Sequence, residues 1–254
     1  MARGAFIVVE GLDRSGKTTQ CTALHRQLEA DGVPVKLQKF PDRTTATGKM
    51  IDSYLQSQSD LDDRAIHLLF SANRWEAAES LVQLLESGTS IICDRYAFSG
   101  IAFSTAKSLP TAPSSKPDPS SNVPPPTSTT TSTLTYEWCR APDIGLPAPD
   151  LVLFLDVSPE IQAQRGGFGE ERYEKADLQR RVREVFRRIE GEFTDIGNGG
   201  EIGASLKWCR IDAGRTQDEV WDDVWEAVKP FVHTRAEAGS TAQGTIKRLW
   251  NHLQ

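Results

Sequence analysis

Cysteine is scarce in this sequence, and its few copies are scattered. Cys21, Cys93, Cys139 and Cys209 stand far apart in a chain of 254 residues, and none forms a C-x-x-C pair. Structural zinc sites and secreted disulfide frameworks both need cysteines at short, regular spacings. We therefore expect neither kind of site, and we interpret the four side chains as reduced thiols in the core.

Long apolar runs are also missing. A membrane-spanning helix needs about 20 mainly apolar residues, whereas the apolar run at the N-terminus, Phe6–Val9, ends at Glu10. The same run is too short for the apolar core of a secretory signal peptide. We therefore expect no membrane association and a protein of the cytoplasm, with the nucleus as a second location.

The chain has no excess of positive charge. It contains 29 Lys and Arg against 35 Asp and Glu, for a net charge of −6. Proteins that bind long nucleic acids usually carry a basic surface, so we expect no nucleic-acid partner. The sequence also contains no Asn-Lys pair, which the guanine-specific N-K-x-D signature requires. A GTPase switch is therefore disfavoured.

Residues 107–135 differ in composition from the rest of the chain. Among these 29 residues, seven are Pro, seven are Ser and seven are Thr. Such a segment cannot bury enough apolar surface to offset the entropy lost on ordering. We interpret it as a disordered surface insertion within one domain that spans residues 1–254. The alternative is a linker between two smaller domains.

Short apolar runs alternate with longer helical patterns. Five runs are typical of buried strands: Phe6–Val9, Val35–Phe40, Ser90–Cys93, Leu151–Leu155 and Leu206–Ile211. Helical spacing marks the segments Thr18–Asp31, Leu61–Glu86, Asp177–Phe193 and Thr216–Phe231. This alternation predicts a three-layer α/β fold, in which helices cover both faces of a five-stranded parallel sheet. Ligands then bind at the carboxyl ends of the strands.

The first strand–helix connection carries a phosphate-binding motif. Residues 11–18 read Gly-Leu-Asp-Arg-Ser-Gly-Lys-Thr, which matches G-x-x-x-x-G-K-[ST] in the required context. Backbone N–H groups of such a loop surround phosphates, and the helix N-terminus adds partial positive charge. Lys17 then reaches the terminal phosphates of a nucleoside triphosphate, and the Thr18 hydroxyl ligates Mg²⁺. The motif therefore predicts the P-loop NTPase version of the fold.

Charged residues follow two other predicted strands. Asp94 comes directly after Ser90–Cys93 and is a candidate second Mg²⁺ ligand, with a strand-end cap as the alternative. Arg95 comes next, and Arg43 follows the run that ends at Phe40. Two arginines at neighbouring strand ends are suited to clamp a second phosphate group. A solvated surface pair would show the same pattern.

Two further segments suit nucleotide chemistry. Phe70 and Arg74 are four residues apart on a predicted helix and share a face, so a ring could stack on a base while a guanidinium donates to its carbonyl. A core Phe beside a surface ion pair is the alternative. Residues 165–174 contain three glycines between arginines, a composition that favours a flexible lid over transferring phosphates.

Six ordered blocks of the sequence resemble those of eukaryotic thymidylate kinases. They are Phe6–Gln20, Phe40–Arg43, Leu68–Trp75, Asp94–Gly100, Gly145–Leu151 and Gly167–Tyr173. The resemblance implies an enzyme that uses Mg²⁺ to transfer the γ-phosphate of ATP to dTMP, giving dTDP and ADP on the way to dTTP. It also implies a homodimer whose small-molecule partners are dTMP and ATP.

The resemblance implies roles for individual residues as well. The implied ATP site comprises Gly11, Leu12, Asp13, Arg14, Ser15, Gly16, Lys17, Thr18, Thr19 and Arg165. The implied dTMP site comprises Asp13, Phe40, Arg43, Phe70, Arg74, Arg95, Ser99, Gly100, Phe103, Ser104 and Tyr173. The implied catalytic residues are Arg14, Lys17, Asp94 and Arg95, and the implied metal ligands are Thr18 and Asp94.

Different parts of the nucleotides are assigned to different side chains by this resemblance. Contacts to the base are implied for Phe70, Arg74, Ser99 and Ser104, and contacts to the sugar for Asp13, Phe103 and Tyr173. The resemblance also implies that Arg43 and Arg95 hold the acceptor phosphate, that Arg14 neutralises charge at the γ-phosphate, and that Arg165 assists the donor nucleotide.

Two alternatives fit the same scaffold. The first is a kinase of a related deoxynucleotide or deoxynucleoside, because discrimination between dTMP and dUMP depends on one methyl group. The second is a nucleotide-binding protein without catalysis. The complete set of Arg14, Lys17, Thr18 and Asp94 argues against the second.

Overall fold

The computed structural model describes residues 2–109, 134–165, 171–194, 206–237 and 244–251. Most of the predicted insertion therefore lies outside the described residues, as does the central part of the predicted lid. The insertion's boundaries need correction, because Lys107 and Ser108 end a helix and Leu134 is buried in the core. Within the described part of the chain, no helix is long and apolar enough to cross a membrane.

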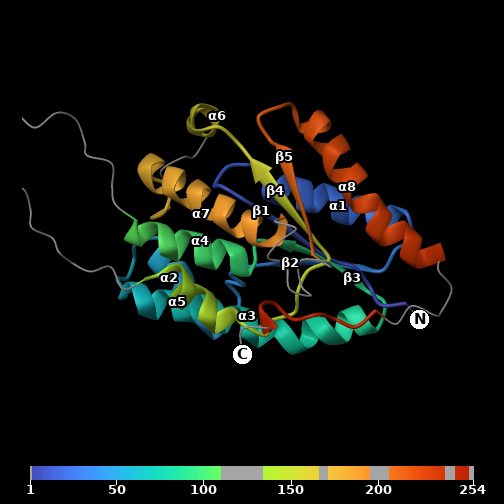
Figure 1. Cartoon of the computed structure of the whole chain (residues 1–254), viewed down its shortest axis with the longest axis horizontal. Helices are drawn as coiled ribbons and strands as arrows, with labels where there is room; N and C mark the ends of the chain where they lie inside the picture. Colours follow the sequence, from blue (N-terminus) through green and yellow to red (C-terminus); the bar gives the residue numbers. More distant parts are fainter. Residues whose placement is uncertain (1, 110–133, 166–170, 195–205, 238–243, 252–254) are drawn as a thin grey trace, which may run out of the picture.

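A five-stranded parallel sheet forms the centre of the molecule (Figure 1). Its strands are β1 (Phe6–Gly11), β2 (Val35–Lys39), β3 (Ser90–Asp94), β4 (Leu151–Asp156) and β5 (Lys207–Asp212). Their order in the sheet is β2-β3-β1-β4-β5, so β1 lies between β3 and β4. The five predicted strands are confirmed. Strands β1 and β3 are parallel neighbours, so their carboxyl ends lie at the same edge of the sheet. The phosphate-binding motif, which follows β1, therefore lies beside Asp94 at the end of β3.

Alternate residues of β1 face two separate cores. Phe6 and Val8 belong to one hydrophobic cluster, while Ile7 and Val9 belong to the other, because successive side chains of a strand point to opposite faces. The second cluster includes residues of α1 (Lys17–Ala30) and α8 (Gln217–Glu237), which lie together on one side of the sheet (Figure 1). The three-layer prediction is therefore confirmed.

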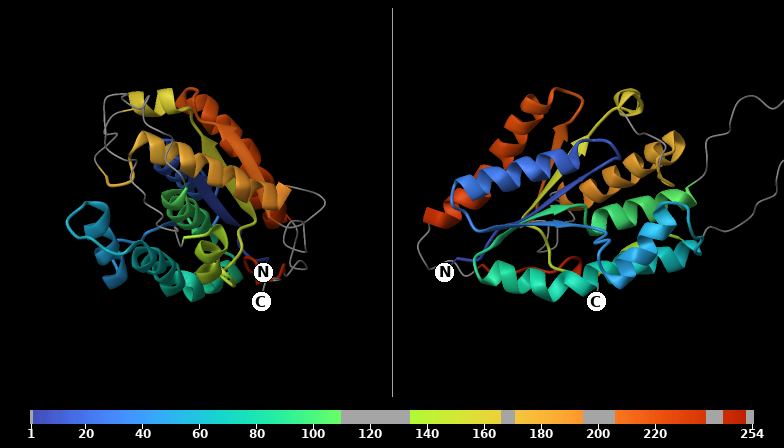
Figure 2. Two further views of the ribbon diagram at one scale, coloured as in Figure 1. Left: turned by 60° about the vertical axis from the view of Figure 1, so that its left-hand side comes forward. Right: turned by 180° about the vertical axis from the view of Figure 1, so that it is seen from behind.

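The opposite face of the sheet is covered by α3 (Asp63–Glu86), α4 (Ala97–Ser108) and α7 (Ala176–Thr194) (Figure 2). Four shorter elements complete the described chain. They are α2 (Ala46–Leu55), α5 (Tyr136–Arg140), the 3-10 turn η1 (Ala141–Asp143) and α6 (Pro159–Gln164). Thr45 and Asp62 begin α2 and α3 by accepting hydrogen bonds from backbone N–H groups of the first turn, as helix caps do.

Helix α4 is one of the helices that the sequence pattern did not reveal. Nearly all its residues are buried, including the polar Ser99, Ser104 and Thr105. A helix that is enclosed on all sides has no polar stripe, and therefore no amphipathic period to detect. Its small residues instead allow close approach of α3, α7 and the sheet, and this approach brings α4 to the edge of the cavity described below.

The C-terminal segment packs back onto the core. Leu249 and Trp250 are buried, and the Leu249 N–H donates to the Leu146 carbonyl over 2.8 Å. An isolated antiparallel bridge between Pro147 and Arg248 holds the same region. All four cysteines are free; three are buried and Cys209 is half-buried.

Candidate active site

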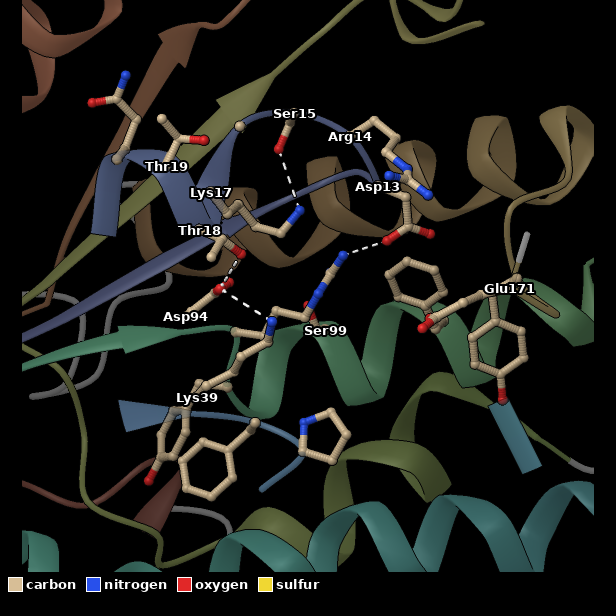
Figure 3. Close-up of a pocket in the computed structure, with 18 of the residues that line it drawn as sticks. Asp13, Arg14, Ser15, Lys17, Thr18, Thr19, Lys39, Asp94, Ser99 and Glu171 are labelled. Atoms are coloured by element: carbon tan, nitrogen blue, oxygen red, sulfur yellow. Dashed lines mark hydrogen bonds and ion pairs between the residues drawn. The ribbon is translucent and has the colours of Figure 1, made fainter. Parts of the chain in front are cut away.

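A cavity of about 710 Å³ opens at the carboxyl ends of β1 and β3 (Figure 3). Its walls come from the phosphate loop, the β2–α2 connection, α3, α4 and the described ends of the lid. Every residue of the predicted ATP and dTMP sites lines it except Gly11 and Leu12. Gly11 ends β1 and Leu12 is buried beneath the loop. The topology therefore gathers residues from distant parts of the chain.

The phosphate loop has the backbone expected of its motif. Gly16 has a φ of 93° and directly precedes α1, a conformation that costs glycine little and other residues more. The Lys17 ammonium lies against the loop, where Nζ donates to the Leu12 carbonyl over 2.5 Å and to Ser15 Oγ over 3.3 Å. The loop and its lysine are thus arranged around one small concave surface.

Burial changes the acidity of Lys17. Its side chain is almost fully buried, and this desolvation, together with the nearby Arg95 cation, lowers the pKa of Lys17 to about 8. The carboxylates of Asp13, Asp94 and Glu10 act in the opposite direction. Lys17 therefore stays mainly charged at neutral pH, but with a much smaller margin than an exposed lysine.

Thr18 and Asp94 place two side-chain oxygen atoms next to each other beside the loop. Thr18 Oγ1 donates to Asp94 Oδ2 over 2.5 Å, and Lys39 Nζ lies 3.9 Å from the same carboxylate oxygen. Figure 3 shows the three side chains converging at the strand ends. One hydroxyl and one carboxylate suit Mg²⁺, which usually takes its other ligands from water and substrate phosphates. Asp94 ends β3 as predicted.

The two predicted clamp arginines lie on the walls of the same cavity. Arg43 forms ion pairs with Asp52 over 2.7 Å and with Glu171 over 2.9 Å. Arg95 donates to the Asp13 carboxylate and to the Gly11 carbonyl. Both arginines line the cavity and have carboxylate partners, with Arg95 the less exposed of the two, while the Arg43 side chain is 36% exposed.

Arg14 and Arg165 come together at the other side of the loop. Arg14 Nε donates to Glu174 Oε1 over 2.9 Å. Arg165 Nη1 donates to the Arg14 carbonyl over 2.7 Å, while its Nη2 donates to the Ala213 carbonyl over 2.6 Å. Both described ends of the predicted lid thus contact the loop or residues beside it.

Phe70 and Arg74 of α3 lie on one wall of the cavity. Phe70 is half-buried, whereas Arg74 is buried and forms a bidentate ion pair with Asp143, at 3.1 Å and 2.7 Å. The ion pair expected as an alternative therefore exists, but in the interior. Gly100 faces this guanidinium, since a Cβ atom at position 100 would lie 2.8 Å from Arg74 Nη2.

Ser99 is held by a buried acid that the sequence did not reveal. The Tyr96 and Ser99 N–H groups donate to Glu10 Oε1, and the Ser99 hydroxyl donates to Glu10 Oε2 over 2.5 Å. Burial raises the pKa of Glu10, although these hydrogen bonds act in the opposite direction. Arg95 also donates to the Ser99 hydroxyl, over 3.1 Å. Glu10 therefore fixes the start of α4 beneath the arginine.

Further aromatic side chains, Phe40, Tyr96, Phe103 and Tyr173, line the cavity. Phe103 and Tyr173 are stacked with ring centroids 5.6 Å apart, and the Arg95 guanidinium lies 5.4 Å from the centre of the Phe103 ring. Phe40 is buried and packs against Tyr96, with centroids 5.7 Å apart. The predicted sugar-contacting pair is therefore brought together by α4 and the lid.

Two buried glutamines hold Asp13, and sequence reasoning missed both. Gln179 Nε2 donates to Asp13 Oδ2 over 2.6 Å, and the Asp13 N–H donates to Gln179 Oε1 over 3.1 Å. Gln162 Nε2 donates to the Asp13 carbonyl over 2.8 Å. No spacing or motif signals these residues, because they lie 149 and 166 positions from Asp13. Their effect is to fix the loop acid that orients Arg95.

Comparisons with known proteins agree with this geometry. The thymidylate kinase family model matches residues 9–118 and 128–222, so residues 119–127 of the predicted insertion fall between the two matched stretches. The thymidylate kinase of Schizosaccharomyces pombe is 44% identical over 226 residues, which are 89% of this chain and 92% of that protein. The human thymidylate kinase is 38% identical and matches 92% of this chain and 94% of its own.

A solved structure gives the same result. The structure of thymidylate kinase from Candida albicans superposes with a TM-score of 0.76 at 36% identity, covering 98% of this chain and 99% of that one. The phosphate loop, the metal-type oxygen pair and the arginine-lined cavity lie within the matched region. The chain belongs to the thymidylate kinase family.

Proposed function

We propose that this thymidylate kinase transfers the γ-phosphoryl group of ATP to the phosphate of dTMP in the cavity described above. The reaction gives dTDP and ADP, a step toward dTTP. One observation supports the proposal most directly: the phosphate loop, Arg43 and Arg95 all line a single cavity. Phe70 and Arg74, the residues expected to contact the base, line the same cavity. Donor and acceptor phosphates can therefore lie in line between the two ends.

The reaction needs no proton-transfer residue. A phosphate monoester has its second pKa near 6, so the acceptor oxygen is largely ionised at neutral pH and is already a nucleophile. Catalysis then depends on positioning the two anions and neutralising the charge between them. We assign the donor phosphates to Lys17 and Arg14, and the acceptor phosphate to Arg43 and Arg95.

The oxygen pair of Thr18 and Asp94 fits Mg²⁺. Hydroxyl and carboxylate oxygens are hard donors, and Mg²⁺ takes most of its remaining ligands from substrate phosphates and water. When bound, the metal neutralises charge on the β- and γ-phosphates. Lys39 sits 3.9 Å from Asp94 and adds positive charge at the same place.

The test of this proposal is an acceptor profile. Purified full-length protein with ATP and Mg²⁺ is assayed for ADP release with dTMP, dUMP, dCMP, dGMP, AMP, thymidine or no acceptor. We expect the highest kcat/KM with dTMP, followed by dUMP. Preferred turnover of another acceptor would still support ATP binding at the phosphate loop, but it would reject the assignment of Phe70 and Arg74 to the thymine base. Tight dTMP binding without any turnover would favour a binding protein.

Arg14 provides the sharpest test of a single catalytic role. We expect Arg14→Ala to lower kcat by at least about a hundredfold, because it removes positive charge from the transferring group. Its melting temperature should stay within a few degrees of wild type, since one partly exposed ion pair contributes little stability. Arg180→Ala is the matched control, because Arg180 pairs with Asp177 on α7 and does not line the cavity. Near-normal kcat for Arg14→Ala would exclude the assignment.

We further propose a homodimer and a cytoplasmic location, with the nucleus as a second location. The large apolar side chains of Met50, Leu68 and Trp75 are exposed on α2 and α3, a surface suited to a second copy. Light scattering after gel filtration tests the oligomeric state, with twice the 28.1 kDa chain mass expected. Imaging of a tagged protein tests the location.

A further inference from the structure

His67 lies behind the base end of the cavity and takes no part in the mechanism above. It belongs to α3, is fully buried and does not line the cavity. Its Nε2 lies 2.8 Å from the Cys139 carbonyl oxygen, and its Nδ1 lies 2.8 Å from Ser104 Oγ. The ring also packs against Trp138, with centroids 5.4 Å apart. His67 therefore connects α5 to a residue of the cavity wall.

These contacts determine where the protons are. A carbonyl oxygen only accepts, so His67 Nε2 must carry the hydrogen that is donated to Cys139. Burial and the nearby Arg74 cation lower the pKa of His67 to about 4, so the ring is neutral at physiological pH and Nδ1 keeps its lone pair. The Ser104 hydroxyl must then donate its single proton to Nδ1.

This leaves Ser104 with one kind of polarity toward the cavity. A hydroxyl has one proton and two lone pairs. The Ser104 proton is already donated to His67 Nδ1. Ser104 lines the cavity together with Phe70 and Arg74, so it can only accept a hydrogen bond from a ligand there. The Arg74 guanidinium has donors and no acceptor. The wall therefore presents one donor group beside one acceptor.

We propose that His67 is a positioning residue for base specificity, which holds the Ser104 hydroxyl as an acceptor and so selects pyrimidines that carry N3–H beside a carbonyl. Thymine and uracil have this pattern. Cytosine has the reverse, with an acceptor at N3 and an amino group in place of the carbonyl. In cytosine, the acceptor N3 would face the acceptor oxygen of Ser104, and the amino donor would face the Arg74 donors. Neither pair can form a hydrogen bond, and burying polar groups without partners lowers the binding affinity. The inference rests on the proposed function, in which the base of dTMP lies at this wall.

Two substitutions at position 67 separate positioning from structure. Asn places its Oδ1 close to the place of Nδ1, so His67→Asn keeps an acceptor for Ser104. Gln places its amide close to the place of Nε2, so His67→Gln keeps the donor to Cys139 and releases the Ser104 proton. We expect His67→Gln to lower the ratio of the dTMP and dCMP affinities by about tenfold to a hundredfold. His67→Asn should retain most of the ratio.

The affinities are measured as the KM of dTMP and the inhibition constant of dCMP, with ATP and Mg²⁺ present. dUMP is the internal control, because it also carries N3–H and its affinity relative to dTMP should not change. An equal ratio in both variants, or an unchanged ratio in His67→Gln, would overturn the inference. Wild-type protein that does not turn over dTMP would instead overturn the proposed function.

Ser104→Ala gives an independent result if both His67 variants fold poorly. It removes the acceptor while leaving His67 in place. We expect this variant to bind dTMP and dUMP about tenfold or more weakly, with dCMP inhibition unchanged or strengthened. A larger loss for dCMP would mean that the hydroxyl donates to the base, and the inference would be wrong.

Discussion

At the scale of single residues, the cations around the phosphate loop already have partners within the protein. Lys17 donates to the Leu12 carbonyl, Arg14 pairs with Glu174 and Arg95 pairs with Asp13. Phosphate oxygens accept from the same donor groups in similar geometry. These side chains are therefore held near the positions in which they would meet a substrate, and binding exchanges one oxygen partner for another.

The lowered pKa of Lys17 predicts a pH dependence. The charged form binds phosphate, and it is lost as pH rises through a pKa of about 8 rather than 10.5. The pH dependence of kcat/KM reports the pKa values of the free enzyme. We therefore expect kcat/KM for ATP to be nearly constant around pH 7 and to fall about tenfold per pH unit well above pH 8. A profile from pH 6.5 to 9.5 checks this, with circular dichroism as the control for folding. A level profile up to pH 9.5 would contradict it.

At the scale of elements, the close approach of α3 and α4 positions the base-binding wall. Gly100 of α4 faces the Arg74 guanidinium of α3, which Asp143 holds from η1. Glu10 of β1 holds the first turn of α4 through two backbone N–H groups. Four elements distant in the sequence thus meet around the Arg74 guanidinium and the first turn of α4, and neither of these can shift without breaking a buried contact.

Gly100→Ala tests this packing. Helix propensity alone favours Ala over Gly by about 1 kcal/mol, but the new Cβ would lie 2.8 Å from Arg74 Nη2 and 2.9 Å from Nη1. Arg74 must then move while its ion pair with Asp143 resists the movement. We expect the KM for dTMP to rise at least about tenfold, because displaced contacts weaken substrate positioning. The KM for ATP should change less than about twofold, and an unchanged dTMP KM would reject the packing argument.

At the scale of the whole molecule, the C-terminal segment completes one of the two cores. The Trp250 ring lies 5.8 Å from the Phe98 ring of α4 and 6.1 Å from the Phe193 ring of α7, centre to centre. Its Nε1 donates to Glu192 over 3.3 Å. Phe98 and Phe193 also contact Trp208 of β5. The last residues of the described chain therefore cover α7 and also α4, which carries part of the cavity wall.

Trp250→Ala should lower the free energy of unfolding by about 3 to 5 kcal/mol, the usual result when a large aromatic side chain is removed from a core. Urea denaturation monitored by circular dichroism measures the change. Asn251→Ala is the matched control. The Asn251 side chain is exposed and adjacent to Trp250 in the sequence, so its removal should change the free energy of unfolding by less than about 0.5 kcal/mol. A loss below about 1 kcal/mol for Trp250→Ala would show that the segment is not part of the core.

Different elements of this fold were predictable to different degrees. The five strands were predictable because each buried parallel strand is a short apolar run, and α1 and α7 were predictable because one face of each is apolar. Helices α2, α4 and α5 were missed. Helix α4 has no polar stripe to mark it, and its Ser and Gly residues have weak helix propensity, so its structure depends on tertiary burial.

The sequence by itself determined the phosphate loop, the parallel sheet and the family, because these depend on local motifs and on the order of apolar runs. Only the tertiary structure decided what surrounds the site. Asp143 meets Arg74, Gln179 meets Asp13 and His67 meets Ser104 across 69, 166 and 37 positions of the chain. Such pairs have no spacing rule, because packing of the helices on the sheet brings them together. Burial then sets the charge of Lys17 and the proton of His67.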